Sequence, residues 1–244
     1  MTLTISKFRR LLPLLPVLAV TVFTAACAPL TAPPQSEYSV GRARLVLPPG
    51  AWQGLGTSEE AVTGSGGRTL LQTRDVALRG AQGEWLAVLR VQTNVTSDLR
   101  GSPQGVGYCP RQQDVLVKDV ADGSPVRADC LRFKLWASSP KWLEKNRPDL
   151  VRWMAEREIT LSAPYSHVGY RYVTEAGVWV VVDALVDQRL LSTRPRNNEE
   201  FMLAGRPAQQ WAYDLAQAVR LSAGMVDGHL AVPPFPFPAS PPRP

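Results

Sequence analysis

The sequence is short of the residues that metal sites and catalytic nucleophiles need. It has three cysteines and two histidines, His167 and His229, in 244 residues, whereas zinc sites of the usual type take three or four His or Cys ligands. It also lacks a G-x-S-x-G serine motif, a phosphate loop with lysine followed by Ser or Thr, and a G-x-G-x-x-G dinucleotide loop. We therefore expect no metal and no cofactor.

A membrane-spanning apolar run is missing as well. The charge-free stretch 11–26 has sixteen residues and contains Pro13 and Pro16, whereas a transmembrane helix needs about twenty apolar residues. Three cations, Lys7, Arg9 and Arg10, precede the stretch and small residues end it. This layout is typical of a secretory signal, so we expect residues 1–26 to be a signal peptide.

The end of this segment, Thr24-Ala25-Ala26-Cys27, resembles the lipobox of bacterial lipoproteins, although Thr24 stands where that family usually has Leu. The resemblance implies cleavage before Cys27 by signal peptidase II and attachment of diacylglycerol and palmitate to Cys27. Because Ala28 follows, it also implies sorting to the outer membrane, on its periplasmic face. The alternative is ordinary secretion after the A-x-A site 26–28, which gives Cys27 no purpose.

The chain has little excess charge once this segment is removed. The net charge is +6, from 27 cations and 21 acids, and loss of residues 1–26 leaves 24 cations against the same acids. The cations Arg189, Arg194 and Arg196 are interrupted by Pro195 and form no basic run. We expect no nucleic-acid partner; a polyanion-binding surface would require the arginines to gather on one face. The expected partners are the membrane, through the anchor, and an envelope protein.

Composition and proline content divide the mature chain into three parts. Residues 27–37 hold three prolines and no apolar period and are expected to be the lipidated Cys27 and a flexible tether. Residues 38–224 have the size and apolar content of a single globular domain. Residues 225–244, with seven prolines in the last twelve positions, are expected to be a disordered tail that a proline-recognising partner could bind.

Two cysteines remain if Cys27 is acylated. In the oxidising periplasm pairing is the default, so we predict a disulfide between Cys109 and Cys130.

The order of expected elements indicates an α+β fold, an antiparallel sheet built from hairpins with two to three helices on one face. We expect a strand over 38–47, a glycine-rich loop over 54–67, and hairpins over 68–79/84–95, 114–120/126–136 and 167–175/178–186. Helices are expected from the Ser139 cap, interrupted at Pro148, to about 158, and over 207–221. The first strand with the following Leu-Pro-Pro-Gly-Ala-Trp, and the last helix, resemble the PsbP-like accessory fold, which implies a binding or assembly role.

The third hairpin supplies the one constellation suited to chemistry. A three-residue turn would place Gly169 opposite Asp183, with Arg171 diagonal to Asp183 and His167 on the same face. The strand 178–186 is apolar on both faces apart from Asp183, so it should be central in its sheet. The trio His167, Arg171 and Asp183 could bind an anion or serve a small periplasmic hydrolase; the alternative is a buried Arg–Asp ion pair. Ser166 should point to the other face. We expect a non-enzymatic binding or envelope-assembly role.

Overall fold

The computed structural model describes residues 36–64, 67–96, 107–139, 141–193, 197–224 and 228–238. The expected signal peptide, Cys27, nearly all of the tether, Pro140, Arg194 and Arg196 lie outside these ranges. The strands are β1 (Glu37–Val40), β2 (Ala43–Val46), β3 (Ala51–Gly64), β4 (Gly67–Arg79), β5 (Trp85–Asn94), β6 (Leu116–Asp119), β7 (Ala128–Lys134), β8 (Tyr165–Val173), β9 (Trp179–Asp187) and β10 (His229–Ala231). The helices are α1 (Trp142–Asn146), α2 (Pro148–Ala155), α3 (Gln188–Leu191), α4 (Asn198–Leu203) and α5 (Arg206–Gly224).

Seven strands form one antiparallel sheet in the order β3-β4-β5-β9-β8-β7-β6. A smaller sheet has the order β1-β2-β10, in which β10 runs parallel to β2. The α+β class with a mainly antiparallel sheet is confirmed. Strand β9 is the fourth of seven, as its apolar character on both faces predicts.

The three predicted hairpins are present as β4–β5, β6–β7 and β8–β9. In the last hairpin Gly169 is paired with Asp183 and Arg171 with Val181. The predicted register is therefore confirmed, and with it the face that the candidate residues share.

The prediction of a glycine-rich loop over 54–67 is wrong. Residues Ala51–Gly64 form β3, which pairs with β4 along its whole length, and a register shift lies between Gly54 and Gly56. Gly56 has a φ of 143°, a value that glycine adopts readily. Glycine here permits a bulge inside a strand, which a reading of glycine as a loop signal misses.

The expected single strand over 38–47 is two strands, because the chain turns at Gly41-Arg42. Gly41 has a φ of 50°, and a Cβ there would lie 2.3 Å from Thr93 Oγ1. Both the turn and the close approach to β5 require glycine.

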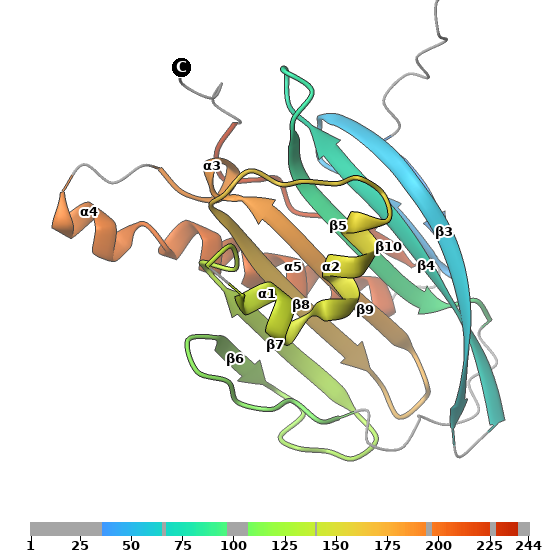
Figure 1. Ribbon diagram of the computed structural model, residues 1–244. Coiled ribbons are helices and arrows are strands. Elements are labelled where there is room, and N and C mark those ends of the chain that lie inside the picture. The colour runs from blue at the N-terminus through green and yellow to red at the C-terminus, as the bar shows by residue number, and fades with distance from the viewer. Residues whose placement is uncertain are drawn as a thin grey trace, which may run out of the picture. The chain divides into compact units, whose positions relative to one another are not determined.

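Helices pack on both faces of the large sheet, so their expected placement on one face is not confirmed. Figure 1 shows α1 and α2 in front of the sheet and α5 behind it. Trp211, Leu215 and Val219 of α5 share a core with Val182 and Val186 of β9. In the second core, Leu150 and Trp153 of α2 pack with Leu185 of β9. Because successive strand residues face opposite ways, the apolar β9 requires a cover on each side.

Helix α1 does not begin on the predicted cap. The residue before it is Lys141, in a left-handed conformation with no side-chain capping bond. The interruption at Pro148 is confirmed, since Pro148 is the first residue of α2. The break places Arg147 between the two helices.

Residues 228–238 are ordered and pack against the domain, which corrects the expectation of a disordered tail over 225–244. Strand β10 completes the small sheet, and the indole N–H of Trp211 donates to the carbonyl of Pro233 at 3.1 Å. The ring of Phe235 lies between those of Trp211 and Trp52, at centroid distances of 5.2 and 6.3 Å. Burial of an aromatic ring offsets the entropy of fixing a proline-rich segment that has little entropy to lose. No helix among the described residues is long and apolar enough to cross a membrane.

Candidate functional site

A row of charged residues crosses the face of the large sheet that carries α1 and α2. The strand register places Asp75 of β4 beside Arg90 of β5, Arg90 beside Asp183 of β9, and Asp183 beside Gly169 of β8. Beyond Gly169 the row continues with Arg132 of β7. The charges alternate in sign along the row, and the glycine interrupts it between Asp183 and Arg132.

Gly169 leaves a hollow at this interruption. Its backbone is not in the left-handed region, and a Cβ added there would lie 3.2 Å from His167 Cε1 and 3.4 Å from Asp183 Oδ1. Glycine is therefore not needed for the backbone conformation. Its effect is to keep a side chain out of the space between two charged strands.

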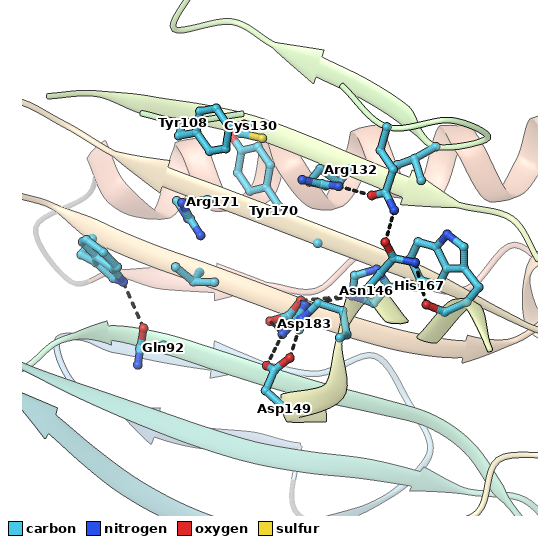
Figure 2. Close-up of a pocket in the computed structure, with 17 residues that line it drawn as sticks. Gln92, Tyr108, Cys130, Arg132, Asn146, Asp149, His167, Tyr170, Arg171 and Asp183 are labelled. Carbon is cyan, nitrogen blue, oxygen red and sulfur yellow. Dashed lines mark hydrogen bonds and ion pairs between the residues drawn. The ribbon is translucent and has the colours of Figure 1, made fainter. Parts of the chain in front are cut away.

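The hollow is the floor of a pocket of about 430 Å³. The sheet supplies the floor, α1 and the α1–α2 junction supply one wall, and the segment before β6 supplies another through Tyr108, Gln112 and Val115. Figure 2 shows Arg132, Arg171 and Asp183 on neighbouring strands of this floor. The three candidate residues His167, Arg171 and Asp183 all line the pocket, so they are brought together as predicted.

Asp183 forms an ion pair with Arg147, a residue that the sequence prediction did not include. Arg147 Nη2 lies 2.9 Å from Asp183 Oδ2, and Nη1 bonds to Oδ1. Arg147 also donates to both oxygens of Asp149, at 3.1 and 2.8 Å. The guanidinium is thus held by two carboxylates. The sequence pattern does not mark Arg147 as part of the site, because this residue lies between α1 and α2 and not on the strands that carry the other candidates.

These contacts determine the ionisation of Asp183. Burial would raise the pKa of this carboxyl, but a hydrogen bond from His167 and the charge and hydrogen bonds of Arg147 outweigh burial and hold the pKa well below its usual range. His167 Nε2 lies 3.1 Å from Asp183 Oδ1 and 3.2 Å from Arg147 Nη1. Asp183 is therefore a fixed anion already bonded at both oxygens, and one ring nitrogen of His167 faces it.

Arg132 and Arg171 are the cations that the pocket presents on β7 and β8. Burial, and then the positive charge of Arg147, lower the pKa of Arg132, and burial is also the main cause that lowers the pKa of Arg171. Asp183 opposes the shift of Arg171, whereas Arg147 adds to it. Partial loss of solvent and the nearby positive charge of Arg147 therefore act on both guanidiniums in the same direction. A bound anion would act in the opposite direction.

A hydrogen-bonded chain links the walls. Gln112 accepts from Arg132 and donates to Asn146 of α1, and Asn146 donates to the carbonyl of Trp142 at 2.7 Å. The predicted disulfide Cys109–Cys130 is present and attaches the same segment to β7. Gln112 thus holds the pocket wall against both the floor and α1.

Helix α2 is fixed to the other end of the charged row. The indole N–H of the buried Trp153 donates to Asp75 Oδ2 at 2.9 Å, and Arg90 Nε donates to Asp75 Oδ1 at 3.1 Å. The guanidinium of Arg90 lies over the Trp153 ring, 4.8 Å from its centroid. These contacts supply Asp75 with two hydrogen-bond donors. They also fix α2, which carries Asp149, against β4 and β5.

The described residues that line the pocket include no serine or threonine, and the lining cysteine, Cys130, is in the disulfide. Ser166 donates to the carbonyl of Leu135 at 2.8 Å, on the face opposite to His167, as predicted. The described part of the chain contains no group of three or more His, Cys, Asp or Glu residues placed to hold a metal ion. The arrangement is suited to binding and holding charge.

Comparison with models of known families, with curated proteins and with solved structures finds no match to this chain in any of the three.

Proposed function

We propose that the protein is a lipid-anchored, non-enzymatic binding protein of the bacterial envelope, and that the pocket over Gly169 receives an anionic ligand. The observation that carries this proposal is the pair of guanidiniums, Arg132 and Arg171, that neighbouring strands present at an open hollow. Arginine matches carboxylate and phosphate oxygens through two parallel hydrogen bonds. Its presence twice on the floor of one pocket favours an oxyanion as the ligand.

The hydrogen bonds already made by Asp183 and His167 favour a binding function over hydrolysis. Asp183 is bonded at both oxygens by Arg147, and His167 directs one nitrogen to Asp183. The alternative, a small periplasmic hydrolase or anion-binding enzyme using His167, Arg171 and Asp183, gains from their convergence on one pocket. It requires in addition a nucleophile or an activated water. The described lining residues include no serine, no threonine and no free cysteine.

The envelope location rests on the sequence. Cys27 in its lipobox-like setting would anchor the mature chain, and residues 28–36 would separate the domain from the outer membrane. The resemblance to the PsbP-like layout is consistent with a binding role. A lipid-anchored receptor for a small anion, which could pass its ligand to an envelope protein, combines these features.

Thermal unfolding in the presence of small oxyanions tests the pocket. Benzoate or phosphate, compared with chloride at equal ionic strength, should raise the Tm of the wild type, because a ligand that binds only the folded state stabilises it. The rise should be absent in Arg132→Gln and Arg171→Gln. An equal rise in these variants, or no rise with either anion in the wild type, would refute the pocket as an anion site.

Membrane fractionation tests the anchor. Cys27→Ala should move the protein from the membrane fraction to the soluble fraction. Unchanged fractionation would refute lipidation at Cys27 and leave the pocket proposal untouched.

A further inference from the structure

The lining of the pocket is cationic on β7 and β8 and apolar on part of β9. Beyond Gly169 on β8 and on the adjacent β7 it presents Arg171 and Arg132, whereas beyond Asp183 on β9 it presents Val181 and Trp179. Val115 adds an apolar side chain to the lining from the disulfide-linked segment. A ligand that was only a small charged group would leave the β9 side facing water.

The polar atoms on the β9 side are already bonded within the protein. The indole N–H of Trp179 donates to Gln92 Oε1 at 3.2 Å, and the backbone N–H of Trp179 donates to Asn94 Oδ1 at 3.2 Å. The amide nitrogen of Gln92 donates to Thr73 Oγ1 at 3.2 Å. With its N–H satisfied, Trp179 offers a ring surface, which binds apolar and aromatic groups through area and stacking.

The size of the pocket also exceeds the needs of an inorganic anion. Its volume of about 430 Å³ lies within the range of about 300–1,000 Å³ that is typical of sites for small organic molecules.

Building on the proposed anion site, we infer that its ligand is an amphipathic oxyanion with a flat apolar body of aromatic size. The oxyanion group lies over Gly169 and accepts from Arg132 and Arg171. The body extends along Val181 and Trp179. Gly169 makes this possible, because a larger side chain at that position would fill the space between Arg132 and Asp183 in which the oxyanion group lies.

Three probes separate the two halves of this ligand class: 2-naphthoate has both the charge and the flat body, acetate has only the charge, and 2-naphthylmethanol has only the body. By titration calorimetry 2-naphthoate should bind with a Kd at least about tenfold below that of either half, since charged and apolar contacts are then made together. Arg132→Gln and Arg171→Gln should each raise that Kd at least about tenfold. Arg44→Gln, on the exposed face of the small sheet, should leave it unchanged, and Trp179→Leu should raise it at least about threefold.

Each outcome has a distinct meaning. Acetate binding as tightly as 2-naphthoate, with the same dependence on Arg132 and Arg171, would overturn the amphipathic ligand and keep the anion site. Tight binding of 2-naphthylmethanol that ignores both arginines would overturn the amphipathic ligand and the anion site together, as would the absence of heat with every probe. Circular dichroism verifies that each variant is folded; if Arg132→Gln is not, Arg171→Gln and Trp179→Leu decide the question.

Discussion

Arg147 and Asp183 join the α1–α2 junction to the central strand β9 through two parallel hydrogen bonds. The pair also positions His167, whose Nε2 contacts both partners. Helix α1 is also attached to the sheet by the packing of Leu143 in the second core and by Gln112. Of these attachments, the ion pair is the one that fixes the helix junction directly over the candidate residues.

Asp183→Asn should destabilise the protein by on the order of 3 kcal/mol, because it leaves a largely buried guanidinium with an incomplete set of anions. Urea unfolding measures the change. Asp149→Asn, which removes the more exposed carboxylate of Arg147, is the matched control and should cost less than about 1 kcal/mol. Equal costs for the two variants would contradict the assignment of Asp183 as the main partner.

The same pair predicts how stability depends on pH. The pKa of Asp183 lies below its value in an unfolded chain, about 3.9, so the folded state holds fewer protons there than the unfolded state. The contribution of Asp183 is then complete above that value and is lost as the pH falls through the lower, folded pKa. Unfolding free energies measured from about pH 5 to pH 2.5 should fall more steeply for the wild type than for Asp183→Asn. Parallel curves would show that Asp183 is not the group responsible.

A larger side chain at Gly169 should weaken ligand binding with little effect on the stability of the fold. Gly169→Val keeps an allowed backbone conformation and adds an isopropyl group above the floor. We expect a change in stability of less than about 2 kcal/mol, since overpacking is partly offset by the strand preference of valine. Binding of 2-naphthoate should fall by more than about tenfold. Gly169→Ala, which adds only a Cβ at 3.2 Å from His167 Cε1, should fall between wild type and Gly169→Val. Normal binding to Gly169→Val would place the ligand elsewhere.

The disulfide should support the pocket wall. Replacing Cys109 and Cys130 together by serine removes a link that closes 21 positions of chain, which should cost about 3 kcal/mol by the loop-entropy estimate. Because Tyr108 and Gln112 lie on the linked segment, the affinity for 2-naphthoate should fall as well. Thermal unfolding and calorimetry measure the two effects. A loss of stability with full affinity would show that the wall holds its position through Gln112 and Asn146 alone.

The sequence predicted what local rules determine and missed what arises from distant contacts. Turn length alone gave the pairing of Gly169 with Asp183 and of Arg171 with Val181, and hence the shared face of the candidate residues. Arg147 could not be predicted, since its approach depends on how α1 and α2 pack across the sheet. Ionic partners in a sheet are not limited to strand neighbours, which is why a prediction based on strand register omitted the Arg147–Asp183 pair.

Two further errors have the same physical origin. Gly54 and Gly56 favour a loop by local preference, but pairing with β4 outweighs the low strand preference of glycine. The prolines of residues 233–238 favour disorder by local preference, but Phe235 in this segment stacks with Trp211 and Trp52. In both cases a tertiary contact overrides a local preference.

Mass spectrometry of the protein purified from its own envelope tests the central claim most directly. Native spectra of the wild type should contain a bound small molecule whose mass is absent after denaturation, and the released molecule should be anionic and absorb as an aromatic compound. The Arg171→Gln protein, purified identically, should carry none of it. A wild type that carries no anionic molecule, or an Arg171→Gln protein that carries the same molecule in equal amount, would contradict the account.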